Sequence, residues 1–193
     1  MPRPRSDSRA RIIASARTLM RRQGYHATGL TQVIEHSGAP RGSVYFLFPG
    51  GKEQLAVESV RASTAEWSEL IRQARAASPT PRDWVERMAG HFAEALRASD
   101  FTEGCPVTTV TLDTVPSSEP LTHASRSAYR SWLDALAEGL TEYGVAGDRA
   151  DNLAMLMLAT LEGALVLCRA FESTEPMARV VDQVLALIDL PGT

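Results

Sequence analysis

Apolar side chains recur at helical spacing along most of the chain. Ile12, Ala16 and Leu19 share one face of a helix, and arginines occupy several of the positions between them. Signals for β-strands are scarce, because no run alternates apolar and polar residues between hairpin turns. The pattern therefore predicts an all-α fold.

Glycines and prolines divide the first fifty residues into three short helices. Gly24 ends the first helix, and Gly38 ends a second helix that starts after Gly29. Pro40 suits the first turn of a third helix, which stops at the Phe-Pro-Gly-Gly run of residues 48–51. Because only a tight turn containing glycine separates the second and third helices, the spacing predicts a helix-turn-helix.

The rest of the chain reads as a body of longer helices. We expect helices over residues 52–77, 84–98, 121–143, 149–171 and 175–188, with a short apolar segment over residues 104–115. The most apolar stretch, residues 153–168, contains Glu162 and is shorter than a membrane span of about 20 residues. We predict a DNA-binding domain over residues 1–52 and a helical ligand-binding and dimerisation domain over residues 53–193.

Charge divides the chain at the same place. The net charge is −3, but residues 1–52 hold nine cations against two carboxylates, which gives this segment +7. The remaining 141 residues therefore carry −10. A basic segment on an acidic body is typical of a module that binds phosphates, although a solvated basic terminus without a partner has the same composition.

The third predicted helix is the best candidate for reading DNA. Val44 and Phe48 can pack inward, which leaves the other side chains facing outward at a width that suits the major groove. Arginine can pair with guanine there, and a tyrosine hydroxyl can contact a phosphate. Our candidate DNA-binding residues are Thr28, Thr31, Arg41, Gly42, Ser43, Tyr45, Phe46 and Lys52.

Taken together, these motifs resemble the tetracycline-repressor family of bacterial regulators. The resemblance is carried by residues 12–16, 24–25, 28–38, 42–45, 48 and 52–55. It implies an all-helical dimer with three N-terminal helices for DNA, a C-terminal domain for a small-molecule inducer, and a four-helix dimer bundle made from the last two long helices. Residues 49–51 and 104–107 are similar to the subgroup of lincomycin- and flavonoid-responsive repressors.

Aromatic and methionine side chains of the body are candidates for an inducer pocket, although most such residues simply fill a core. A few polar groups would orient the ligand. The candidate ligand-binding residues are Trp67, Met88, His91, Phe92, Cys105, Thr108, Thr109, Trp132, Met155 and Phe171.

Other classes of protein are less well supported. The four histidines, His26, His36, His91 and His123, have no metal spacing, so we expect no metal site and no cofactor. Cys105 near a histidine would be a nucleophile pair, but no hydrolase signature surrounds it, and we predict that the chain is not an enzyme. With two cysteines outside any C-x-x-C pair and no secretory signal, we expect a cytoplasmic protein without membrane contact.

These observations predict a homodimeric transcription regulator. We expect a repressor that a small-molecule inducer releases from a palindromic double-stranded operator, and a ligand-dependent activator of the same family is the alternative. An enzyme using Cys105, or a structural helical protein, would show no DNA affinity that depends on salt.

Overall fold

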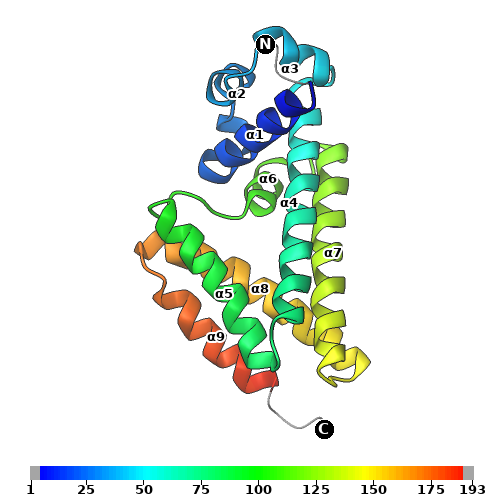
Figure 1. Ribbon diagram of the computed structural model, residues 1–193, viewed down its shortest axis with the longest axis vertical. Coiled ribbons are helices and arrows are strands. Elements are labelled where there is room, and N and C mark those ends of the chain that lie inside the picture. The colour runs from blue at the N-terminus through cyan, green and yellow to red at the C-terminus, as the bar shows by residue number, and fades with distance from the viewer. Residues whose placement is uncertain (1–4, 189–193) are drawn as a thin grey trace. The chain divides into compact units, whose positions relative to one another are not determined.

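A computed structural model describes residues 5–188, and in this part every element is a helix. The first three helices form the N-terminal head (Figure 1), and the longer helices predicted from the sequence follow, with the segment after residue 105 as a helix of its own. The bounds are α1 Arg5–Ala27, α2 Leu30–Ser37, α3 Arg41–Leu47, α4 Gly51–Ala76, α5 Pro81–Ala98, α6 Pro106–Thr114, α7 Glu119–Glu142, α8 Gly147–Phe171 and α9 Glu175–Ile188. The predicted all-α fold is confirmed.

The helices form two compact units. The first unit combines the chain up to residue 64 with residues 105–128, so it includes α6 and the first part of α7. The second unit contains residues 65–104 and the chain from residue 129 onward. The division that we predicted after residue 52 stays a prediction.

The core of the first unit is built from the positions that the helical pattern marked. Ile12 and Met20 of α1, Val33 of α2 and Leu55 of α4 are all buried. Gly24 interrupts α1 with φ +79° and ψ 178°, a conformation that glycine adopts without strain. The last turn of α1 therefore continues in a new direction toward α2.

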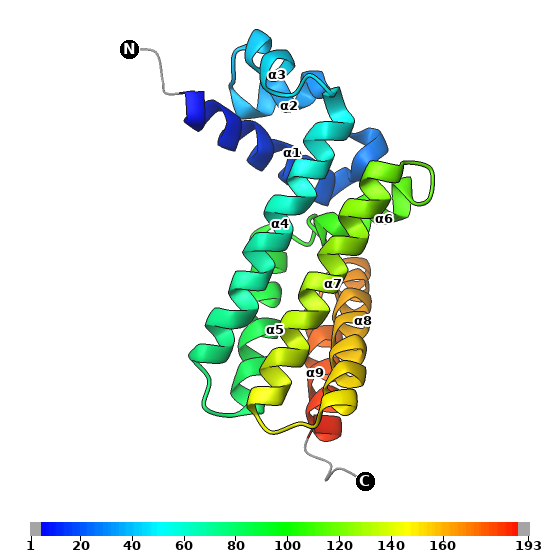
Figure 2. The same cartoon turned by 90° about the vertical axis from the view of Figure 1, so that its right-hand side faces the viewer.

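The second unit is organised around Trp84 of α5, which is fully buried. Its indole N–H donates to the carbonyl oxygen of Ile71 over 3.2 Å. A Cβ at Gly139 would lie 2.5 Å from the indole, so the close approach of α7 to α5 requires glycine at this position. In the same unit α8 packs against α9, and α5 contacts both of them (Figure 2).

Helix α8 carries apolar residues on both its buried side and its exposed side. By length and composition it could cross a membrane, and 39% of its most apolar window is buried inside the protein. The buried part, which includes Leu153, Met157 and Leu165, belongs to the core of the second unit. Other apolar side chains of α8, among them Met155, Val166 and Phe171, are exposed.

Candidate nucleic-acid interface and ligand cavity

The turn between α2 and α3 is tight and well bonded. Gly38 adopts the left-handed conformation, with φ 59° and ψ 21°. The Ser37 hydroxyl accepts from the backbone N–H of Ala39 over 3.2 Å, and a guanidinium nitrogen of Arg11 donates to the Ser37 carbonyl over 3.0 Å. The turn is thus fixed by α1 as well as by its own residues, which sets the direction in which α3 leaves α2.

Helix α3 has one inward and one outward face. Val44 and Phe48 are buried, as the sequence predicted. Arg41 and Gly42 are exposed, and Tyr45 exposes 52% of its surface. A short helix with these outward side chains has the dimensions and the donors for the major groove of DNA.

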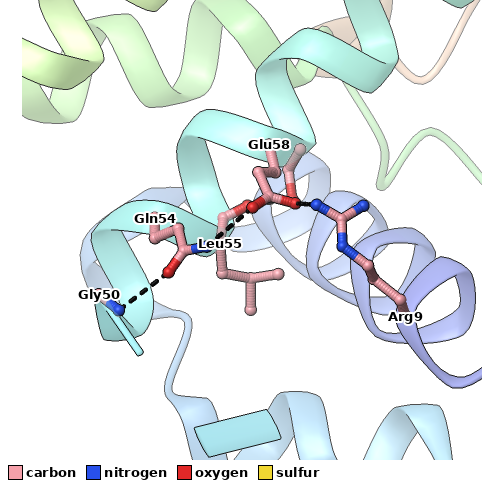
Figure 3. A network of polar contacts seen from close by, with 6 residues as sticks. Arg9, Gly50, Gln54, Leu55 and Glu58 are labelled. Atoms are coloured by element: carbon pink, nitrogen blue, oxygen red, sulfur yellow. Dashed lines mark hydrogen bonds and ion pairs between the residues drawn. The ribbon is translucent and has the colours of Figure 1, made fainter. Parts of the chain in front are cut away.

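A chain of polar contacts holds the turn after α3 against α1 and α4 (Figure 3). The backbone N–H of Gly50 donates to the side-chain oxygen of Gln54 over 2.9 Å, and the Gln54 amide donates to Glu58 over 2.9 Å. Glu58 pairs with Arg9 of α1, whose guanidinium lies 5.6 Å from the ring centroid of Phe48. These contacts fix the C-terminal end of α3 from two helices.

Lys52 lies at the start of α4 and already has partners within the first unit. Its ammonium group donates to the carbonyl oxygen of His26 over 3.1 Å and lies 4.3 Å from the ring centroid of Tyr25. Burial lowers the pKa of Lys52, and the charge of Asp113 acts in the opposite direction. Burial also raises the pKa of Tyr25. An ammonium group has three N–H donors, so Lys52 can bond His26 and still contact a phosphate.

Helix α6 is bonded to the last turns of α1. The Asp113 carboxylate accepts the backbone N–H of His26 over 3.1 Å, and the His26 ring donates to the Asp113 carbonyl over 2.8 Å. The Thr109 hydroxyl donates to the carbonyl oxygen of Met20 over 2.9 Å. A Cβ at Gly24 would lie 2.5 Å from the Asp113 carboxylate, so this packing also requires the glycine.

The second unit contains an apolar cavity of about 520 Å³, its opening to solvent included. Five helices, α4, α5, α7, α8 and α9, contribute to its wall. The side chains at the cavity are Trp67, Ile71, Val85, Met88, Ala89, Trp132, Leu136, Met157, Leu158, Thr160, Leu161, Met177, Val180, Val181 and Val184. No residue in this described wall is ionisable, and the Thr160 hydroxyl donates to the carbonyl oxygen of Leu156 over 2.6 Å.

Two family descriptions match this chain. Residues 12–58 match the bacterial regulatory proteins of the TetR family, and residues 81–183 match the C-terminal domain of the LmrA/YxaF-like transcriptional regulators. The chain belongs to the TetR family. The match to the second description confirms the LmrA/YxaF-like subgroup as well.

Relatives agree with this assignment over nearly the full length. The HTH-type transcriptional regulator YxaF of Bacillus subtilis is 34% identical, over 97% of this chain and 98% of the relative. The HTH-type transcriptional regulator LmrA of the same organism is 35% identical, over 90% of this chain and 93% of the relative. The crystal structure of a TetR regulatory protein from Rhodobacter sphaeroides superposes with a TM-score of 0.83 at 18% identity, over 91% and 95% of the two chains. This TetR-family chain is therefore a DNA-binding transcription regulator and not an enzyme.

The structure of this TetR-family regulator separates the predicted DNA-binding residues by exposure. Arg41, Gly42, Tyr45, Phe46 and Thr31 are exposed, and Ser43 and Lys52 are half-buried. Thr28 is buried, and its hydroxyl donates to the carbonyl oxygen of Gly24 over 2.7 Å. The Thr28 hydroxyl is therefore already bonded inside the protein, whereas Thr31, at the start of α2, faces outward.

The predicted ligand-binding residues fall into three groups. Trp67, Met88 and Trp132 line the cavity, and the Phe92 ring lies 4.1 Å from that of Trp67. Cys105, Thr108 and Thr109 belong to the first unit, beside or within α6, and are not part of the cavity wall. His91 is exposed on α5, while Met155 and Phe171 expose 55% and 68% of their surfaces on the outer side of α8.

Sequence reasoning missed most of the aliphatic wall and the bonds of α6. Leu136, Leu161 and Val180 line the cavity but look like any other core residue in the sequence. Asp113 of α6 has His26 of α1 as its partner. Only the three-dimensional packing brings these two residues together.

Proposed function

We propose that this regulator is a cytoplasmic homodimeric repressor that leaves a near-palindromic operator when an uncharged small molecule fills the cavity of the second unit. The observation that carries the proposal is one chain with both an exposed, arginine-bearing helix α3 and an apolar cavity without ionisable residues in its described wall. A ligand can shift the equilibrium only by binding more tightly to a state that does not fit the operator.

The outward face of α8 supports the dimer. Exposed positions recur every three or four residues along it, at Met155, Ala159, Gly163, Val166 and Ala170. Such a stripe is apolar, and its small residues allow a second helix to approach closely. On the neighbouring helix α9, Leu187 is also exposed. Two copies paired through α8 and α9 would bury these side chains and present two α3 helices to half-sites one DNA turn, about 34–36 Å, apart.

The composition of the cavity selects the kind of inducer. A charged ligand would lose its hydration without gaining a partner, which costs far more than burial of an apolar group. Trp67 and Trp132 offer flat surfaces whose ring centroids are 5.9 Å apart. Flat, uncharged ligands fit such a wall best, and the adaptable side chains of Met88 and Met157 suit several shapes.

The test combines binding with transcription, using the full-length protein and the DNA upstream of its own gene. We expect the protein to prefer this duplex over a scrambled one and to silence a reporter driven by it. Flavone, an uncharged flat probe suggested by the subgroup, should release the duplex and restore the reporter, whereas a flavone carboxylic acid should not. A reporter that requires the protein for activity would contradict the repressor and favour the activator.

A further inference from the structure

The side chain of α3 that points most directly away from the core is a hydrocarbon. Phe46 exposes 73% of its surface, compared with 52% for Tyr45 and 1% for Phe48. With about 100° of rotation per residue, Phe46 lies about 200° from Val44 and about 160° from Phe48, the two buried side chains of this segment. Phe46 is thus on the side of α3 opposite the core.

The neighbours of Phe46 favour close contact with a surface outside the protein. Gly42 lies one turn earlier on the same face, and a Cβ built there meets nothing within 4 Å. Internal packing therefore does not explain the glycine, whereas access to the bottom of a groove does. Arg41 and Tyr45 lie together on one flank of Phe46, where their polar groups can bond a guanine edge or a phosphate.

The chemistry of the major groove identifies what an exposed phenyl ring can contact there. Among the base edges, the thymine C5-methyl group is the apolar contact, and the other groups are hydrogen-bond donors or acceptors. The charge of +7 on residues 1–52 favours duplex DNA over an apolar protein surface as the partner of this face.

We infer that Phe46 is a specificity residue of this regulator, which packs its ring on the C5-methyl of a thymine in each operator half-site. Arg41 and Tyr45 fix the position of α3 beside that thymine. The inference rests on the proposed function, because it presupposes that α3 enters the major groove of an operator.

Replacement of thymine by deoxyuridine tests this contact, since it removes the methyl group and keeps every hydrogen bond of the base. The full-length protein is titrated with the upstream duplex and with duplexes in which single thymines of each half-site are replaced. We expect one thymine per half-site at which wild-type affinity falls about 3- to 5-fold. The Phe46→Ala protein should bind the thymine and deoxyuridine duplexes equally.

Leu112→Ala is the matched control, because Leu112 is an apolar side chain of α6 with 77% of its surface exposed. This variant should keep the wild-type difference between thymine and deoxyuridine. Thermal unfolding of Phe46→Ala shows whether the variant keeps the wild-type fold. The wild-type titration with deoxyuridine duplexes tests the thymine contact even if the Phe46→Ala protein does not fold.

Two results would overturn the thymine contact and leave the proposed function intact. The first is equal wild-type affinity for the thymine and deoxyuridine duplexes at every position. The second is a difference that persists in Phe46→Ala, which would assign the methyl group to another residue. A wild-type protein without preference for the upstream duplex would instead overturn the proposed function, and this inference with it.

Discussion

Gly42 is a residue that we propose serves DNA binding at the expense of stability. It is the second residue of α3, and no neighbour within 4 Å excludes a side chain. Glycine inside a helix costs roughly 0.5–1 kcal/mol relative to alanine, and the cost near a helix start lies at the lower end. The absence of a side chain is therefore expected to benefit the contact with DNA.

We predict that Gly42→Ala raises the free energy of unfolding by about 0.5 kcal/mol and weakens operator binding. Urea denaturation measures the first effect, and fluorescence anisotropy with the upstream duplex measures the second. Gly90→Ala in α5 is the control, since Gly90 also has open space around its Cβ position. This control should be stabilised without a change in DNA affinity. Unchanged binding by Gly42→Ala would contradict a close approach of α3 to the bases.

Residues two positions apart show how far the sequence alone could predict the ligand site. Met157 lines the cavity, and Met155 lies on the opposite side of α8 with more than half of its surface exposed. Both are methionines of the same helix, but composition does not say which side of a helix faces the core. Trp67 and Trp132 were predictable because large aromatic residues on helix faces are seldom left in solvent.

At the scale of elements, α6 is the helix that the sequence did not connect to the head. The predicted helix-turn-helix depends on local signals, namely Gly29, Gly38 and Pro40, and these lie within twelve residues of one another. The bond from His26 to Asp113 joins residues 87 positions apart, and no periodicity carries such information. The three-helix head was therefore predictable, and its attachment to α6 was not.

We predict that Asp113→Ala destabilises the first unit by about 0.5–1.5 kcal/mol, because it removes the acceptor of an exposed hydrogen bond from the backbone N–H of His26. Thermal unfolding measures the loss, and DNA affinity should fall with it, since α1 supports the turn before α3. Asp134→Ala replaces an exposed carboxylate of α7 and should leave both quantities unchanged. Equal stability of the two variants would show that the hydrogen bond between α1 and α6 does not stabilise the first unit.

The outward face of α8 gives a second prediction at this scale. Val166→Glu places a carboxylate in the centre of the proposed dimer face, and an unpaired buried charge costs several kcal/mol. We expect monomers in sedimentation and a loss of operator affinity of about 100-fold or more. Leu112→Glu changes an even more exposed apolar residue, on α6, and should remain a dimer. A dimeric Val166→Glu protein would place the interface elsewhere.

At the scale of the whole molecule, the proposed function requires that ligand binding in the cavity changes DNA binding by α3. We predict that Ala89→Phe, which fills part of the cavity wall, keeps operator binding and repression but no longer responds to flavone. Ala98→Phe, at an exposed position at the end of α5, should respond like the wild type. The reporter with and without flavone measures both variants. A full response of Ala89→Phe would mean that the inducer binds outside this cavity.

The central claim is that the exposed face of α3 reads a specific duplex, and salt-dependent binding tests it most directly. Purified protein is titrated with the upstream duplex and a scrambled duplex between about 50 and 200 mM salt. We predict a clear preference for the upstream duplex, an affinity that falls about 10³-fold or more across this range, and loss of the preference in Arg41→Ala. Equal wild-type affinity for the two duplexes at the lowest salt concentration would contradict the account.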